Sequence, residues 1–333
     1  MNSQDLRRLG RTNLHVTALG LGTTAIGNMY EAVDVQQALD VVHCAWSEGL
    51  RYFDTAPQYG RGLAEERLGL GLVGYDRSAY VLATKVGRLL RADAPPNPDD
   101  FFEGEPYDKA TPAVNTVYDY SRDGVLRSLE ESLERLKTDR VDIVYVHDPD
   151  EYIREALEGA FPTLIELREQ GVVGAIGAGM NQVEALTLFA KETDPDVFLL
   201  AGRYTLLEQG ALDELLPLCE KRGIAVVAGG VYNSGLLADP SPGTHYNYMP
   251  APAEQIERAT CLASICEAHG VPLKAAAIQF PLAHPAVACV LTGARSPAEL
   301  QENIRLFELP LPVSLWEELR AEGLLDPLAP VPA

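Results

Sequence analysis

Short apolar segments and longer amphipathic segments alternate eight times along the 333 residues of this chain. The apolar segments are strand-sized and almost free of polar residues, which is typical of parallel strands covered on both faces. Because two parallel strands need a crossover that a helix supplies, this alternation restricts the chain to α/β folds. The predicted strands are residues 16–22, 50–54, 80–85, 141–147, 172–177, 197–201, 224–229 and 286–291.

The segments between these strands follow the 3.6-residue period of amphipathic helices. In 121–138, apolar residues recur every three or four positions from Val125 to Leu136, and charged residues occupy the opposite face. Eight successive strand–helix units predict a (β/α)8 TIM barrel that forms a single domain over residues 1–333. The predicted helices are 34–48, 63–73, 121–138, 152–170, 181–191, 210–222, 253–283 with a break at Gly270-Val271-Pro272, and 297–306.

An open, doubly wound sheet with a second domain is the alternative fold. Such a sheet is expected to carry a Gly-x-Gly-x-x-Gly turn after an early strand. Gly20 and Gly22 are followed only by Gly27, which is the wrong spacing. The glycine-rich stretch 174–181 also misses this spacing, and it is interpreted as close packing or a tight strand-to-helix turn.

Two segments extend the predicted barrel. Residues 7–22 resemble a short N-terminal hairpin that plugs the bottom of the barrel before the first strand. Residues 87–120 form a long loop after the third strand, rich in proline, acidic residues and aromatics. Such loops are usually lids or disordered segments, and aromatic residues favour a folded lid. The aromatics concerned are Phe101, Phe102, Tyr107, Tyr118 and Tyr120.

The charge balance limits the partners of the chain. Acidic residues outnumber basic ones by 48 to 27, which gives a formal net charge of -21. This charge argues against nucleic acid or an anionic membrane as a partner. The five cysteines are scattered without zinc-site spacing and are expected to be reduced thiols. No segment has the apolar length of a signal peptide or a membrane span, so a cytoplasmic protein is predicted, with no oligomeric state implied.

Four polar or ionisable residues stand at or just after the carboxyl ends of predicted strands. Asp54 ends the second strand and Tyr59 lies in the loop after it. Lys85 ends the third strand and His147 ends the fourth. Alone, each has an ordinary explanation as a turn cap, a lysine reaching for solvent or a core histidine. Together they are candidate catalytic groups, because the carboxyl ends of barrel strands form one face that carries the chemistry.

The chemistry of these four groups is mutually compatible. A free tyrosine has a pKa of about 10, which is too high for ready proton exchange at neutral pH. A lysine ammonium beside Tyr59 is expected to lower that pKa, while Asp54 keeps Lys85 charged. His147 is placed to hydrogen-bond a reacting oxygen. This set suits proton transfer at a C–O group while a cofactor carries the hydride.

Several motifs give the chain a resemblance to the aldo-keto reductases over essentially its full length. The motifs are LGLGT, FDTAPQYG, ATKVG, DIVYVHDP, GVVGAIGAGMN and LTGARSPAELQENI. The resemblance implies that Asp54, Tyr59, Lys85 and His147 form the catalytic tetrad of that family. The segments VGRLL and 119–148 are further similar to the bacterial aldose 1-dehydrogenases of the family, which include L-fucose and D-threo-aldose dehydrogenases. Pyridoxal 4-dehydrogenase and L-galactose dehydrogenase are related to that subgroup.

The resemblance also implies a nicotinamide dinucleotide over the barrel mouth, with its phosphates near 233–237 and 292–303. Members that prefer NADP commonly carry a lysine and an arginine where this chain has Gly293 and Glu299. A glutamate repels a 2′-phosphate, so NAD is expected, while Arg295 keeps NADP open. The implied cofactor contacts are Gly22, Thr23, Asp54, Asn181, Tyr204, Ser234, Gly235, Leu236, Gly293, Arg295, Glu299, Glu302 and Asn303.

The nicotinamide contacts depart from the family pattern. A Ser-Asn pair is replaced by Gly179-Met180, with Asn181 one place later, and the expected stacking aromatic falls at Gly229. Tyr232 or Tyr204 is the candidate substitute for that aromatic. The expected substrate contacts are Tyr30, Tyr59, His147 and Tyr232.

The reaction implied by the resemblance is NAD(P)-dependent oxidation of an aldose, such as L-fucose or another threo-aldose, at its anomeric carbon. The cyclic hemiacetal loses a hydride and gives a lactone directly, while Tyr59 accepts the hydroxyl proton. Three alternatives remain open within this chemistry: pyridoxal 4-dehydrogenase, NADPH-dependent aldehyde reductase and a slow-turnover, cofactor-sensing regulatory subunit. An unrelated phosphate-handling barrel enzyme is the remaining possibility.

Overall fold

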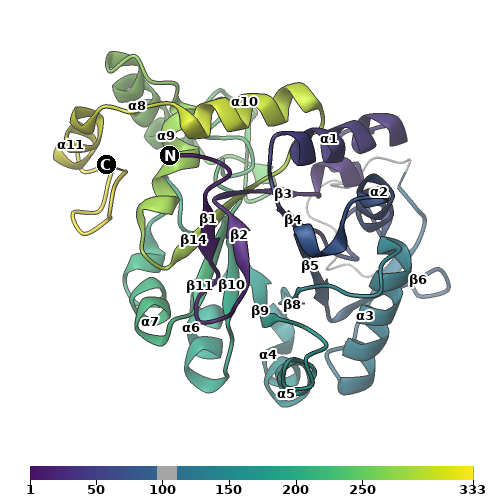
Figure 1. Cartoon of the computed structure of the whole chain (residues 1–333). Helices are drawn as coiled ribbons and strands as arrows, with labels where there is room; N and C mark the ends of the chain where they lie inside the picture. The colour runs from purple at the N-terminus through teal and green to yellow at the C-terminus, as the bar shows by residue number, and fades with distance from the viewer. Residues whose placement is uncertain (96–110, 333) are drawn as a thin grey trace.

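Eight parallel strands close into a barrel in the computed structural model, which describes residues 1–95 and 111–332. The last strand pairs with the first, so the sheet has no open edge, and the predicted TIM barrel is confirmed (Figure 1). The open-sheet alternative is wrong. The barrel strands are β3 (Leu19–Gly22), β4 (Tyr52–Asp54), β5 (Val81–Val86), β8 (Ile143–His147), β9 (Ala175–Met180), β10 (Val197–Ala201), β11 (Ala225–Gly229) and β14 (Val287–Thr292).

Helices surround this barrel, and polar side chains cap several of their amino ends. Asp34 accepts a hydrogen bond from the Gln37 amide, and Ser121 accepts one from Gly124, each satisfying an otherwise free donor. The predicted break in 253–283 is confirmed. The helices are α1 (Val35–Ser47), α2 (Leu63–Leu72), α3 (Arg122–Leu136), α4 (Ile153–Glu155), α5 (Phe161–Glu169), α6 (Val183–Glu192), α7 (Leu215–Arg222), α8 (Ala253–Ala268), α9 (Leu273–Gln279), α10 (Pro297–Glu308) and α11 (Val313–Ala321).

The fifth barrel strand lies three residues later than predicted, at Ala175–Met180 instead of 172–177. Gly177 and Gly179 lie within this strand, and at Gly177 the backbone of the neighbouring strand approaches closely. A Cβ atom at Gly177 would lie 1.6 Å from the carbonyl oxygen of Val197 on β10. Close packing, and not a turn, therefore explains this glycine.

The predicted helix 152–170 is interrupted. A 3-10 turn, η4 (Asp150–Tyr152), precedes α4, and a π-helical turn at Ala156–Ala160 separates α4 from α5. These irregular turns follow directly after β8, whose last residue is His147.

The N-terminal hairpin consists of β1 (Leu6–Arg8) and β2 (His15–Thr17), which pair antiparallel. Leu9 and Val16 are fully buried and belong to the apolar cluster inside the barrel, together with residues at the amino ends of its strands such as Ile143 and Val197. The hairpin therefore closes the barrel bottom, as predicted.

A second antiparallel pair, β6 (Arg88–Arg91) and β7 (Asn115–Tyr118), begins and ends the insertion after β5. Tyr118 stacks on Tyr152, with ring centroids 5.1 Å apart. Phe101, Phe102 and Tyr107 lie outside the described residues. A short pair, β12 (His245–Tyr246) and β13 (Met249–Pro250), lies in the loop after β11. Within the described ranges, no helix has the length and apolarity needed to cross a membrane.

Candidate active site

A buried ion pair joins the carboxyl ends of two neighbouring strands. Lys85 on β5 places its Nζ 2.6 Å from Oδ1 of Asp54 on β4, and both side chains are only 1% exposed. The ammonium also donates to the Thr55 carbonyl at 2.9 Å. Removing two charges from water costs several kcal/mol per ion, of which their attraction returns only part. A pair in this position is therefore poorly explained as a contribution to stability alone.

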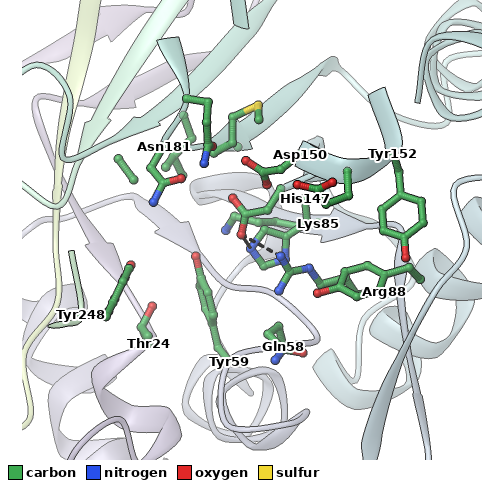
Figure 2. A pocket seen from close by; sticks show the side chains of 18 of the residues that line it. Thr24, Gln58, Tyr59, Lys85, Arg88, His147, Asp150, Tyr152, Asn181 and Tyr248 are labelled. Carbon is green, nitrogen blue, oxygen red and sulfur yellow. Dashed lines mark hydrogen bonds and ion pairs between the residues drawn. The ribbon is translucent and has the colours of Figure 1, made fainter. Parts of the chain in front are cut away.

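Tyr59 and His147 complete the group of four at this barrel mouth, and Figure 2 shows both beside Lys85. Tyr59 lies in the loop between β4 and α2, and its ring centroid is 4.6 Å from the Lys85 ammonium. His147 ends β8, and its ring meets the Tyr59 ring edge-on at a centroid distance of 5.7 Å. Four side chains from three adjacent strands thus share one cluster, as their positions at strand ends predict.

The electrostatics of Tyr59 differ from the sequence-based expectation. Burial raises the pKa of its phenol well above the usual value, and the carboxylates of Asp54 and Asp148 act in the same direction. A hydrogen bond from Thr24 and the charge of Arg88 oppose this rise without cancelling it. The pKa of Tyr59 is therefore raised overall and not lowered as expected, because burial outweighs the charges that favour the phenolate.

His147 is held neutral. Burial lowers the pKa of its imidazole well below the usual value, and the nearby charges of Arg88 and Lys85 lower it further. Its Nδ1 atom is buried and has no hydrogen-bond partner among the described residues. A neutral imidazole in this position serves as a hydrogen-bonding group and not as a reservoir of protons.

Residues from the insertion reach the carboxyl end of β8, where His147 lies. Arg88 on β6 places Nη2 2.9 Å from Oδ2 of Asp148, and the same oxygen lies 3.4 Å from Nε2 of His147. The Tyr120 hydroxyl donates to the carbonyls of His147 at 2.7 Å and Asp148 at 3.1 Å. Sequence reasoning missed Arg88 and Asp148, although they stand in the quoted VGRLL and DIVYVHDP motifs.

Tyr59, Lys85 and His147 border a first cavity of about 400 Å³. Polar side chains from the loops after β4, β8 and β9 line it, together with residues of the insertion. Asn181 lies here. The lining includes Thr24, Met29, Gln58, Tyr59, Lys85, Arg88, Tyr118, His147, Asp148, Asp150, Glu151, Tyr152, Asn181, Gln182, Leu199, Ala201 and Tyr248.

A second cavity, also of about 400 Å³, adjoins the first. The two share Tyr59, Thr24 and Tyr248 in their linings. The second cavity extends past the ends of β11 and β14 to the start of α10, where cofactor contacts were expected. The expected residues that line it are Gly22, Tyr30, Asp54, Tyr232, Ser234, Gly235, Gly293, Arg295 and Glu299.

Five expected cofactor contacts lie outside both linings among the described residues. Thr23 is buried and binds the Asp54 carbonyl through its amide and its hydroxyl, each at 3.0 Å. Tyr204 is 1% exposed and packs against Phe280 and His284. Leu236 is fully buried in the core. The others serve polar contacts: Glu302 pairs with Lys274 at 2.7 Å, and Asn303 accepts a hydrogen bond from Tyr232 at 3.0 Å.

Tyr30 and Tyr232 were expected to contact the substrate. In the part of the chain that the structure describes, they line the second cavity and not the first. Tyr30 stacks on His245 at a centroid distance of 5.7 Å. Tyr248, which lines both cavities, was not expected from the sequence. It lies in the turn between β12 and β13, in the long loop after β11, and the sequence gives no signal for its position.

The second cavity suits an elongated anionic ligand at one end. Helix α10 begins there with Ser296 as its N-cap and Pro297 in its first turn, so its amino end offers partial positive charge. The amides of Gly235 and Leu236 already bind carbonyls within their own turn, at 3.1 and 3.2 Å, which leaves α10 as the better-supported phosphate contact.

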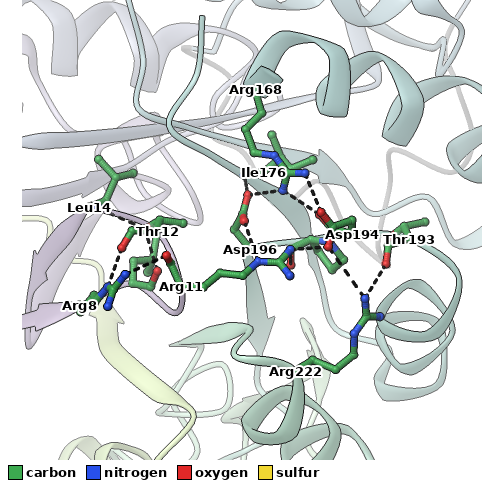
Figure 3. Close-up of polar contacts among 12 residues, drawn as sticks. Arg8, Arg11, Thr12, Leu14, Arg168, Ile176, Thr193, Asp194, Asp196 and Arg222 are labelled. Atoms are coloured by element: carbon green, nitrogen blue, oxygen red, sulfur yellow. Dashed lines mark hydrogen bonds and ion pairs between the residues drawn. The ribbon is translucent and has the colours of Figure 1, made fainter. Parts of the chain in front are cut away.

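A second ionic cluster lies at the opposite end of the barrel (Figure 3). Arg11, in the turn of the N-terminal hairpin, contacts Asp194 at 2.5 Å and Asp196 at 3.4 Å. Arg168 on α5 contacts the same two carboxylates, each at 2.8 Å. Arg222 on α7 approaches Asp194 to 3.9 Å. The bottom network, as we name these five residues, ties the hairpin to α5 and α7.

Comparisons with known proteins agree with this architecture. The aldo/keto reductase family model matches residues 18–322. D-threo-aldose 1-dehydrogenase of Pseudomonas sp is 43% identical over 94% of this chain and 96% of its own length. Pyridoxal 4-dehydrogenase of Microbacterium luteolum is 42% identical over 98% of this chain and 99% of its own. The solved holo form of aldo-keto reductase AKR11C1 from Bacillus halodurans aligns with a TM-score of 0.74 at 26% identity, covering 97% of each chain.

Proposed function

Because the chain belongs to the aldo/keto reductase family, whose members use NAD(P)H, we propose that it is an NAD-dependent aldose 1-dehydrogenase. Its substrate is a neutral aldose such as L-fucose or another threo-aldose, oxidised at the anomeric carbon to the lactone. One observation carries the proposal: the fully buried Asp54–Lys85 pair lies beside Tyr59 where the two cavities meet. The similarity to D-threo-aldose 1-dehydrogenase supports the substrate class.

The residues have distinct roles in this reaction. A bound oxidised nicotinamide supplies the hydride acceptor and one positive charge. Lys85, next to the Tyr59 ring, favours the phenolate over the phenol once the burial penalty is offset. The phenolate takes the proton of the anomeric hydroxyl as the C–H bond is broken, and a C=O bond forms. Neutral His147 donates a hydrogen bond to the same oxygen and holds it in line.

Residues at the start of α10 support the preference for NAD. Arg295 is engaged by Glu31 at 2.6 Å and by Glu299 at 3.4 Å, so two carboxylates surround the one cation. Glu299 also accepts a hydrogen bond from the Arg295 amide at 2.8 Å. This arrangement disfavours a 2′-phosphate. Glu31→Gln combined with Glu299→Gln is expected to raise the kcat/KM with NADP relative to that with NAD.

Pyridoxal oxidation is the second candidate. The specific observation in its favour is the 42% identity to pyridoxal 4-dehydrogenase, which nearly equals the identity to the aldose enzyme. Pyridoxal also exists largely as a cyclic hemiacetal, so Tyr59 and His147 would act on it in the same way.

The test is NADH formation with L-fucose, D-arabinose, L-galactose, L-xylose and pyridoxal, with Tyr59→Phe assayed in parallel. We expect one or more aldoses to be turned over by the wild type and almost none by the variant. Turnover of pyridoxal alone would replace the aldose proposal with the second candidate. Unchanged turnover in the variant would remove Tyr59 as the proton acceptor.

A further inference from the structure

The charges that line the first cavity do not balance. Lys85 is paired with Asp54 at 2.6 Å, and Arg88 is paired with Asp148 at 2.9 Å. Two more carboxylates, the partly buried one of Asp150 and the exposed one of Glu151, line the same cavity. Within the described residues, neither has an ion-pair partner. The cavity therefore carries an excess of negative charge.

These carboxylates lie close to the reacting groups along the chain. Asp150 begins the η4 turn three residues after His147, and Glu151 follows it. Figure 2 shows the Asp150 side chain on the same side of the cavity as His147. Burial is the main cause that raises the pKa of Asp150, and the charge of Arg88 opposes this rise without cancelling it.

Several hydrogen-bonding atoms around this cavity lack partners. Oδ1 of Asp150 and Oε1 of Gln182 are buried acceptors with no hydrogen bond among the described residues. Nδ1 of His147, whose residue is 4% exposed, is unpartnered in the same way. Buried polar atoms in native proteins normally find partners, so a ligand that brings several hydroxyl groups is the natural complement of this set.

We propose that Asp150 and Glu151 form a carboxylate rim that restricts the enzyme to uncharged, polyhydroxylated substrates. Asp150 accepts hydrogen bonds from substrate hydroxyls away from the reacting carbon, and both carboxylates repel substrates that carry phosphate or carboxylate groups. This inference rests on the proposed function and names the determinant of its substrate class.

The expected discrimination follows from the two interactions. A hydrogen bond from a hydroxyl to the partly buried carboxylate of Asp150 is charge-assisted, so losing the hydroxyl is expected to lower kcat/KM by roughly tenfold to 100-fold. Adding a phosphate close to two carboxylates in a partly buried cavity is expected to lower it by about 100-fold or more. Both losses are expected mainly in KM, because the reacting carbon is untouched.

The experiment measures kcat/KM for the best neutral substrate, for its deoxy analogues, and for its phosphorylated or uronic-acid form. Wild type is compared with Asp150→Asn and Asp150→Lys. The matched controls are Glu155→Gln and Glu155→Lys, which change the net charge equally at an exposed α4 residue outside the first-cavity lining. Circular dichroism checks the fold of each variant.

For wild type we expect the neutral substrate to be preferred over its anionic form by about 100-fold. Asp150→Asn is expected to lose most of the discrimination against one deoxy analogue, and Asp150→Lys to improve relative use of the anionic form at least tenfold. The Glu155 variants are expected to behave as wild type. Equal use of neutral and anionic forms by wild type, or unchanged ratios in both folded Asp150 variants, would overturn the rim. No turnover of any aldose or of pyridoxal by wild type would instead overturn the proposed function.

Discussion

The two ends of the barrel use acidic and basic side chains in opposite ways. At the mouth, Asp54 faces one cation and is buried, and burial raises its pKa despite the opposing effect of Lys85. In the bottom network, burial also tends to raise the pKa of Asp194, but hydrogen bonds from Arg11 and Arg168 outweigh it and hold that pKa below its usual value.

This difference separates stability from function within one fold. In the bottom network, the lowered pKa of Asp194 means that folding favours its charged form, which is the sign of a stabilising contact. The mouth pair is retained in the folded chain although burial disfavours its charges. Charged groups whose charged form is disfavoured by folding are candidates for chemistry. Charged groups whose charged form is favoured by folding are better explained as structural contacts.

Tyr59→Phe tests the mouth with the largest expected effect. The substitution removes the phenolic oxygen that we propose accepts the proton, so kcat is expected to fall by about 10³-fold with little change in stability. Steady-state NADH formation and thermal unfolding measure the two quantities. Tyr204→Phe is the matched control, since its buried hydroxyl lacks a hydrogen-bond partner among the described residues and it should leave kcat near the wild-type value.

Substitutions in the mouth pair, Asp54 and Lys85, test how this pair affects the free energy of unfolding. Lys85→Met alone leaves a buried carboxylate without its cation and is expected to destabilise the fold by about 3–5 kcal/mol. The double variant Asp54→Asn/Lys85→Met removes both charges and is expected to recover most of that stability while remaining inactive. Urea denaturation and activity assays compare the three proteins. A double variant as unstable as the single one would show that the pair stabilises the barrel.

Asp196→Asn makes the corresponding test at the bottom. Asp196 accepts from Arg168 at 2.8 Å and from the Ile176 amide at 3.1 Å. Loss of a charged acceptor here is expected to cost about 2 kcal/mol of unfolding free energy and to leave kcat/KM unchanged, because the site lies at the far end of the strands. A specific loss of kcat without loss of stability would contradict the division between the two ends.

The smallest expected effect is on the pH dependence of folding stability, which has opposite signs for the barrel mouth and the bottom network. The pKa of Asp194 is lowered in the folded chain, so its contribution is present above the unfolded value of about 3.9 and is lost as pH falls through the folded value. The pKa of Asp54 is raised, so stability falls as pH rises from the unfolded value through that folded value.

The measurement is unfolding free energy between pH 3 and pH 7. Asp194→Asn should reduce the loss of unfolding free energy at acid pH by only about 0.5 kcal/mol, because the Asp194 side chain is half exposed and its charge is screened. Asp54→Asn/Lys85→Met should change the slope in the other direction. Equal slopes in all three proteins would mean that neither carboxylate is perturbed in the way described.

The barrel and the tetrad positions were predictable because both depend on local sequence. Apolar strands and amphipathic helices carry their periods in the chain, and a residue such as Lys85 at the end of an apolar run must lie at the mouth once the barrel closes. Contacts that depend on the path of a loop were not predictable. Arg88 meets Asp148 only because the β6–β7 pair folds back over the end of β8.

Misplaced expectations have similar causes. Tyr204 follows β10 by three residues, yet its side chain turns into the core instead of the second cavity, a choice that sequence spacing does not encode. The direction of the pKa shift of Tyr59 depends on how completely its ring is buried and on the approach of Asp148, and the sequence shows neither.

The contacts of Tyr120 have a practical consequence for anyone who wishes to transplant this chemistry. Its hydroxyl holds the main chain at His147, although the tyrosine comes from a segment that the barrel itself does not require. Copying the four mouth residues onto another scaffold would leave out the hydrogen bond that positions the backbone of His147. A working graft has to carry the β6–β7 insertion as well.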